Sequence, residues 1–201
     1  MARLRVGLTG GLASGKSTVA RRLAARPGFL VIDADRLVAD LYRPGGEGAA
    51  AVAALFGPRC LAPDGAVDRG TLAAVVFADE PARRRLEQAI HPLVRERFAA
   101  LAAAHDGVAV LEATLLVEAG YRELFDLVVT VEAPAEVRLA RAVARGLSEA
   151  DARARLAAQG DGAARRAASD IVLRNDGDLE RLEAVADDLG ASLRARAGLS
   201  A

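Results

Sequence analysis

The sequence predicts an α/β protein with a doubly wound, five-stranded parallel sheet, a helical insertion and a helical lid. Five short apolar segments recur along the chain, at residues 3–9, 29–32, 108–111, 127–131 and 171–173. Longer stretches rich in alanine, leucine and arginine separate them, as helices separate the strands of a parallel sheet. A glycine-rich turn joins the first apolar segment to the first helical one. These observations favour alternating strands and helices around one sheet.

Length and composition fit one domain, which we assign to residues 1–201. The 27 basic and 27 acidic side chains leave no net charge, so the overall charge favours neither nucleic acid nor a membrane as a partner. The longest charge-free apolar stretch, residues 49–56, is less than half of the roughly 20 residues that cross a bilayer. The single cysteine, Cys60, forms no internal disulfide, and the first residues build no secretory signal. We expect a cytoplasmic protein and assign no oligomeric state.

Lysine usage singles out one position. Of the 27 basic residues, 26 are arginine and one, Lys16, is lysine. Lysine offers a compact ammonium on a thin stem, whereas arginine offers a wide planar fork. We therefore expect Lys16 to lie in a narrow site that requires a point charge and does not accept arginine.

The residues around Lys16 match the pattern G-x-x-x-x-G-K-[ST], with Gly10, Gly11, Leu12, Ala13, Ser14, Gly15, Lys16, Ser17 and Thr18. The pattern lies between the first predicted strand and a helix predicted over residues 17–25, which is the context that a phosphate-binding loop requires. Loop amides and a helix N-terminus attract phosphates, Lys16 reaches the β- and γ-phosphates, and Ser17 offers its hydroxyl to Mg²⁺. The sequence predicts a site for a nucleoside triphosphate with Mg²⁺.

Carboxylates follow three predicted strands, at the edge where parallel sheets bind ligands. Asp33 and Asp35 follow the second strand, Glu112 the third and Glu132 the fourth. Asp33 is suited to orient a substrate hydroxyl and accept its proton, and Glu112 to hold Mg²⁺ directly or through water. Two alternatives stay open: Asp33 or Asp35 caps a helix predicted over residues 36–42, and Glu112 is a solvated strand end.

Arginines gather in the predicted lid, residues 138–168. Arg138, Arg141 and Arg145 are three and four residues apart, so they share one face of a helix. Arginines on a mobile flap neutralise charge on a transferring phosphoryl group and exclude water. We favour Arg141 and Arg145 for this role. The alternative is the solvated surface of an arginine-rich protein.

The helical insertion, residues 43–105, exceeds what a phosphate-binding core needs, and we expect it to bind the acceptor. It contains Arg69, His91 and Arg95. For His91, which precedes a proline, a structural role is favoured over that of a base. After the last strand, Asn175 precedes Asp-Gly; a turn is the default interpretation, and contact with the nucleotide base is the alternative.

Together these features resemble the dephospho-CoA kinase family over almost the whole chain. The resemblance rests on the glycine-rich loop, on Val-Ile-Asp-Ala-Asp ending at Asp35, on the His-Pro segment at residues 86–95 and on Asn175-Asp-Gly. It implies a fold of the P-loop kinase type. It also implies ATP-dependent phosphorylation of the ribose 3′-hydroxyl of dephospho-CoA, giving CoA and ADP, the last step of coenzyme A synthesis.

The resemblance also implies roles for matching residues. Lys16 and the loop amides would hold the ATP phosphates, Asp33 would face the acceptor hydroxyl, and Arg141 would belong to the lid. Asn175 would lie near the adenine. The insertion would receive dephospho-CoA, and we add as candidate acceptor-binding residues Asp35, Arg69, His91, Arg95 and Arg145.

Some positions depart from the family pattern. Glu112-Ala-Thr replaces Asp-x-Pro, Ala13 replaces a glycine, and Arg138 replaces a glutamine. Arginine also occurs at 165 and 166, where the family pattern has a lysine. The first departure bears on the metal role of Glu112, and the last two follow the arginine bias of the chain.

Other functions share many of these features. A nucleoside-monophosphate or other small-metabolite kinase differs only in its acceptor, and a non-catalytic ATP-binding switch would hydrolyse ATP slowly and ignore every acceptor. The Asn-Lys-x-Asp motif with which regulatory GTPases read guanine is excluded, because the one lysine already lies in the loop.

Overall fold

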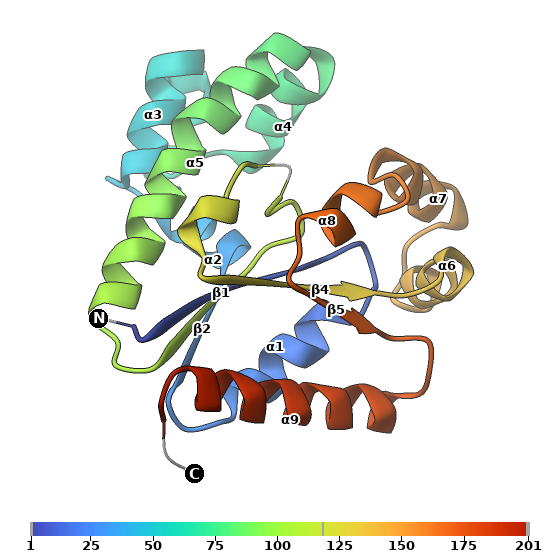
Figure 1. The fold of residues 1–201 in the computed structure, drawn as a ribbon. Helices are drawn as coiled ribbons and strands as arrows, with labels where there is room; N and C mark the ends of the chain where they lie inside the picture. Colours follow the sequence, from blue (N-terminus) through green and yellow to red (C-terminus); the bar gives the residue numbers. More distant parts are fainter. Residues whose placement is uncertain (1, 118, 200–201) are drawn as a thin grey trace. The chain divides into compact units, whose positions relative to one another are not determined.

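The computed structural model describes residues 2–117 and 119–199. The chain forms two compact units (Figure 1). We call Met1–Ile32 with Leu101–Ala201 the core unit, and Asp33–Ala100 the helical unit.

The core unit is built on one five-stranded sheet, in the order β2-β3-β1-β4-β5. The strands are β1 (Leu4–Gly10), β2 (Phe29–Asp33), β3 (Val108–Glu112), β4 (Leu127–Glu132) and β5 (Ile171–Arg174). Strand β1 pairs in parallel with β3 and β4, and β4 pairs in parallel with β5. The predicted doubly wound sheet is confirmed. Each strand ends one residue later than expected, because the residue after each apolar run still takes part in the sheet.

The strand order reverses at β1. From β1 the chain first builds the β3 and β2 side of the sheet, and it then returns to place β4 on the other side of β1. In open parallel sheets, ligands bind beyond the carboxyl ends of the strands at this switch point. The loop that follows β1 lies there.

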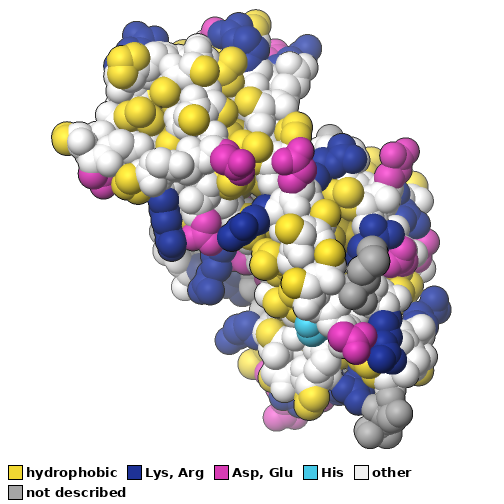
Figure 2. Space-filling model, turned by 90° about the vertical axis from the view of Figure 1, so that its left-hand side faces the viewer, with side chains coloured by type: hydrophobic (Ala, Val, Ile, Leu, Met, Phe, Trp, Pro, Cys, Tyr) yellow, Lys and Arg dark blue, Asp and Glu magenta, His cyan; other side chains and the backbone are white. Residues whose placement is uncertain are grey.

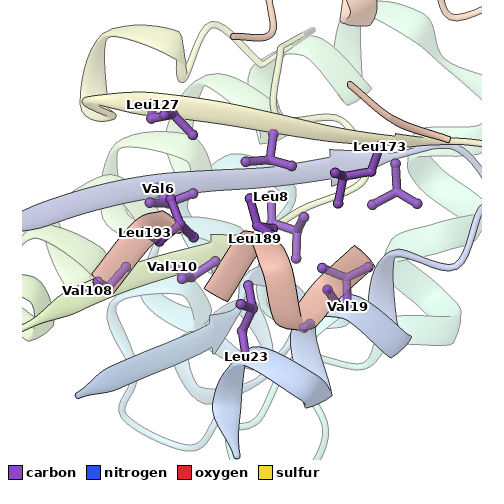
Figure 3. Packing of buried hydrophobic residues seen from close by; sticks show 14 of the residues in the cluster. Val6, Leu8, Val19, Leu23, Val108, Val110, Leu127, Leu173, Leu189 and Leu193 are labelled. Carbon is purple, nitrogen blue, oxygen red and sulfur yellow. The ribbon is translucent and has the colours of Figure 1, made fainter. Parts of the chain in front are cut away.

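Helices α1 (Lys16–Ala24) and α9 (Leu179–Arg196) cover one face of this sheet (Figure 1). Figure 3 shows how their apolar side chains meet those of the strands. Val6, Leu8, Val19, Leu23 and Leu193 are fully buried there. Since burying one such side chain stabilises a fold by about 1.5–3 kcal/mol, this cluster holds the loop between β1 and α1 on a rigid base.

Three helices follow β4 in the predicted lid: α6 (Ala135–Ala144), α7 (Glu149–Ala158) and α8 (Ala163–Ala167). Ser148 caps α7 by accepting a hydrogen bond from the backbone N–H of Asp151. Helices α6 and α7 share a small apolar cluster, which includes Leu139 and Ala152, and Leu12 and Ala13 of the glycine-rich loop pack against it. The loop and these two helices therefore share a surface.

The helical unit contains α2 (Ala34–Leu41), α3 (Glu47–Phe56), the short η1 (Pro58–Cys60), α4 (Arg69–Ala78) and most of α5 (Glu80–Ala103). It has its own core, in which Val52, Cys60 and Leu72 are buried. Helix α2 begins two residues before the predicted start, because the Asp33 carboxylate accepts a hydrogen bond from the backbone N–H of Asp35 and caps the helix.

On the face drawn in Figure 2, basic and acidic side chains are interspersed rather than gathered by sign. Within residues 2–117 and 119–199, none of the helices combines the length and the apolar character that a bilayer crossing demands.

One group of charges joins α1 to α9. The Asp187 carboxylate accepts hydrogen bonds from Arg22 at 2.7 and 2.9 Å and from Arg26 at 2.9 Å. The hydrogen bonds from Arg22 and Arg26 lower the pKa of Asp187 from its ordinary 3.8 to about 2. A carboxylate whose pKa is lower in the folded state stabilises the fold above the unfolded pKa, and this contribution is lost as the pH falls through the folded one.

We therefore expect Asp187→Asn to lower the free energy of unfolding near neutral pH, and its difference from the parent to shrink between about pH 4 and pH 2. Urea unfolding of both proteins across this range measures the difference. Asp188→Asn, one residue further along α9, is the control. A difference that stays constant through this window would contradict the assignment to Asp187.

Candidate active site

The glycine-rich loop holds its shape through backbone conformations that glycine favours. Gly15 has a φ of 104°, and a Cβ atom there would run into the Asn175 amide and lie 2.9 Å from Leu182 Cδ2. Ala13, with a φ of 55°, is the one non-glycine residue with positive φ in the described part of the chain. No side chain caps α1 at Gly15. Among the residues that the structure describes, the helix start therefore has no side-chain cap that would compete with an anion for its N–H groups.

Lys16, Ser17 and Glu112 meet at the start of α1. The Glu112 Oε1 atom accepts a hydrogen bond from Lys16 Nζ at 2.6 Å and another from Ser17 Oγ at 2.8 Å. The Lys16 and Glu112 side chains are only 13% and 10% exposed, so their charges lie away from bulk water. Lys16 and Ser17, from the loop, and Glu112, from the end of β3, thus form one polar centre.

This centre suits Mg²⁺ chemically. A hydroxyl and a carboxylate are the hard oxygen donors that this ion takes, usually together with substrate phosphates and water. In residues 2–117 and 119–199, no three His, Cys, Asp or Glu side chains are grouped as a complete metal cage. Ser17 would hold the ion and Glu112 its waters, with phosphate oxygens as the other ligands. The ion would neutralise charge on the transferred phosphoryl group.

Asn175 ties the end of β5 to the loop. Its side chain is buried at 4% exposure, and Nδ2 donates a hydrogen bond to the Ser14 carbonyl at 2.7 Å. Arg141 donates to Asn175 Oδ1 and to the Gly177 carbonyl, each at 3.3 Å. A cavity of about 170 Å³ lies here, lined by Gly15, Thr18, Arg141, Arg145, Asn175, Gly177, Asp178, Leu179 and Leu182. Arg141, Arg145 and Asn175 thus lie around one small cavity beside the loop.

Replacing Asn175 by alanine is expected to lower the free energy of unfolding by about 1–3 kcal/mol, because it leaves the Ser14 carbonyl without its buried partner. The apparent affinity for ATP should fall as well, since Ser14 belongs to the loop. Denaturant unfolding and titration with an ATP analogue measure the two effects. Asp176→Ala, the exposed neighbour, is the control. Unchanged stability in Asn175→Ala would show that this hydrogen bond does not hold the loop.

Sequence reasoning missed one contact to the loop. Gln159, directly after α7, accepts a hydrogen bond at its Oε1 atom from the backbone N–H of Leu12, at 2.8 Å. A glutamine at the end of a polar helix carries no local signal of such a role. Only the fold brings it to a loop 147 residues away in the sequence.

Arg138 and Arg141 on α6, and Arg145 directly after it, take different directions. Arg138 is buried at 4% exposure, with Nη1 2.6 Å from where a Cβ atom of Gly11 would lie. Arg141 turns to Asn175, and Arg145 ends the helix on the surface. Burial, followed by the charge of Arg165, lowers the pKa of Arg138, and Glu132 opposes this shift. Arg138 therefore lies against the glycine-rich loop, whereas Arg141 contacts the residue that follows β5.

The remaining predicted site residues lie in the helical unit. Asp33 accepts a hydrogen bond from the Asp35 N–H at 2.8 Å, so Asp33 is the cap of α2 and the Asp35 side chain is exposed. The Arg69 guanidinium lies 5.9 Å from the centre of the Tyr42 ring, and burial raises the pKa of that tyrosine. His91 is half-buried inside α5, where burial lowers its pKa, and Arg95 is exposed.

The family model described as dephospho-CoA kinase matches residues 4–181. This match covers most of the chain, including the loop, Glu112, the lid region and Asn175. The chain belongs to the dephospho-CoA kinase family. The dephospho-CoA kinase of Streptomyces avermitilis is 47% identical over 197 residues, which cover 96% of both chains. That of Frankia casuarinae is 47% identical over 95% of this chain and 84% of its own.

Solved structures share this fold. TT1252 from Thermus thermophilus superimposes with a TM-score of 0.80 at 34% identity, over 96% of this chain and 99% of its own. Dephospho-CoA kinase from Campylobacter jejuni gives a TM-score of 0.71 at 26% identity, over 97% and 98%. Shikimate kinase from Acinetobacter baumannii, at 17% identity and a TM-score of 0.53, shares the fold alone. The predicted P-loop kinase fold is confirmed.

Proposed function

We propose that this member of the dephospho-CoA kinase family phosphorylates the ribose 3′-hydroxyl of dephospho-CoA with ATP and Mg²⁺, at the centre formed by Lys16, Ser17 and Glu112. The convergence of these three side chains at the uncapped start of α1 carries the proposal. The lysine supplies the positive charge for the phosphates, and the two oxygen donors suit the ion. The reaction takes place in the cytoplasm, as expected from the sequence.

Phosphoryl transfer depends on positioning and on charge stabilisation. The loop amides, from Gly10 to Thr18, and Lys16 would hold the phosphates of ATP. With nucleotide bound, Lys16 would contact phosphate and Glu112 would hold the waters of the ion, in place of their present contact with each other. Asp33 would orient the 3′-hydroxyl and accept its proton.

The acceptor and the nucleotide would be bound by different parts of the chain. Residues 43–105, most of which belong to the helical unit, would receive dephospho-CoA, with Asp35, Arg69, His91 and Arg95 as acceptor-binding candidates. Residues 138–168 would act as the lid, with Arg141 and Arg145 beside the nucleotide. Asn175 would lie next to the adenine, at the cavity that it lines with Arg141.

The test is the release of ADP from Mg²⁺-ATP with dephospho-CoA, beside AMP, CMP, shikimate, pantothenate and no acceptor. We expect strong stimulation by dephospho-CoA alone, with CoA as the product. Stimulation by one of the other acceptors would be consistent with a kinase but would overturn dephospho-CoA as its substrate. Slow release with no acceptor effect would overturn the kinase and favour an ATP-binding switch.

A further inference from the structure

A second cavity of the core unit lies apart from the one beside Asn175. It has a volume of about 430 Å³ and lies at the ends of β4 and β5, where Glu132, Arg138, Leu156, Gly160 and Arg174 line it. Its lining shares no residue with the smaller cavity of Gly15, Arg141 and Asn175. A cavity of this size is within the range of small-molecule sites, and a second ligand is therefore sterically possible.

The carboxylates around this cavity are already engaged. Glu132 lies 3.6 Å from Arg165 Nε and 3.8 Å from Arg166 Nη1. Asp161 accepts a hydrogen bond from the Ala163 N–H, and Asp176 lies 3.7 Å from Arg181. Glu132 and Asp176 thus each lie near an arginine other than Arg138 and Arg174, although the charge of Glu132 also acts on Arg138.

Arg138 and Arg174, two arginines of the wall, differ from these carboxylates in their contacts. Within residues 2–117 and 119–199, neither Arg138 nor Arg174 has a hydrogen-bond or ion-pair partner, and Arg138 Nε is buried. Arg138 is 4% exposed, whereas Arg174 is exposed at the end of β5. A guanidinium withdrawn from water is stabilised by hydrogen-bond acceptors, and an anionic acceptor also balances its charge. Its five N–H groups match the oxygens of a phosphate or carboxylate.

The rest of the wall is apolar. Pro134 and Ala135 begin α6, Leu156 lies on α7, and Val172 of β5 is 39% exposed although it is a large hydrophobic residue. Water next to such a surface is released when an apolar group covers it. The wall therefore offers two guanidinium groups for a dianion and an apolar surface for the group that carries it.

We propose that this cavity binds an organic phosphate monoester, with its phosphate on Arg138 and Arg174 and its apolar body against Leu156 and Val172. The site is a second ligand site, separate from the ATP phosphates. It adjoins the glycine-rich loop, because Arg138 also touches Gly11.

Phenyl phosphate is a suitable probe, since it has one phosphate and one apolar ring. Titration is followed by NMR of protein labelled with ¹⁵N-glycine, both nucleotide-free and with saturating Mg²⁺-AMP-PNP to fill the phosphate loop. We expect the Gly160 amide to shift in both states, because Gly160 lines the cavity. Gly45 and Gly65, in the helical unit, should not shift. Loss of the Gly160 shift with AMP-PNP bound would overturn the proposal.

Arg138→Gln is expected to weaken phenyl phosphate binding by at least about 10-fold, because it removes a charge-assisted hydrogen bond to the phosphate. Arg174→Gln, at an exposed position, should weaken it several-fold and keeps the test valid if Arg138→Gln does not fold. Arg155→Gln, on α7 outside the lining, is the matched control and should bind as the parent does. Parent-like affinity in Arg174→Gln, or in folded Arg138→Gln, would overturn the site.

Inorganic phosphate and phenol are the two partial probes. We expect each to bind more weakly than phenyl phosphate, because each meets only one part of the wall. Equal affinity for inorganic phosphate would overturn the apolar contact. Equal affinity for phenol would overturn the role of the arginines.

Discussion

Lys16→Arg is expected to lower kcat/KM by at least about 10²-fold, although it retains the positive charge. Removing one group that stabilises transition-state charge commonly costs 10²- to 10³-fold. Lys16 Nζ lies 2.6 Å from Glu112 in an enclosed centre, where the wider planar guanidinium does not fit in the same place. Steady-state kinetics with Mg²⁺-ATP and dephospho-CoA measure the effect.

Arg21→Lys is the matched control for this substitution. Arg21 lies on the same helix and is exposed, so the exchange of the same two residue types should leave the kinetics unchanged. Thermal unfolding of both variants separates loss of activity from loss of fold. An active Lys16→Arg enzyme would disprove the interpretation of the single lysine as a requirement of the site.

Asp33→Asn is expected to lower kcat by about 10²-fold or more and to leave the apparent affinity for ATP unchanged. General-base catalysis contributes about 10²- to 10⁴-fold, and asparagine does not accept the proton. Asp33 also caps α2, and asparagine is as good a cap as aspartate. The substitution therefore removes the proton acceptor without removing the cap. Stability should therefore stay close to that of the parent.

Asp40→Asn is the control for Asp33→Asn, since Asp40 lies on the same helix and pairs with Arg43 on the surface. Its kinetics should match the parent. Turnover near the parent value in a folded Asp33→Asn enzyme would leave Asp33 as a helix cap with no catalytic part. A large rise in KM for ATP would instead place Asp33 at the nucleotide.

The roles of Lys16 and Asp33 are predicted from different kinds of sequence observation. Lys16 is identified by a contiguous pattern, in which the other loop residues are its neighbours along the chain. Asp33 is identified by its place at the end of a strand, where the alternative was that Asp33 or Asp35 caps the following helix. The structure assigns the cap to Asp33, because the Asp33 carboxylate accepts a hydrogen bond from the Asp35 N–H.

The sequence by itself determined the sheet and the phosphate loop. Apolar runs predict strands because buried parallel strands need them on both faces, and the loop needs only adjacent residues in one conformation. The family followed from the same local motifs, supplemented by segments whose spacing along the chain is specific. The helix ends were less well determined, as the start of α2 shows, because capping depends on which side chain turns back to the backbone.

Contacts between distant residues were decided only by the tertiary structure. Glu112 meets Lys16 across 96 residues, and Gln159 meets Leu12 across 147. Helical spacing put Arg138 and Arg141 on one face, yet packing buried the first against Gly11 and turned the second to Asn175. Spacing along a helix fixes where a side chain starts, whereas its end is placed by neighbours from other strands and helices. Long, flexible arginine side chains are therefore the part of this site that sequence patterns predict least.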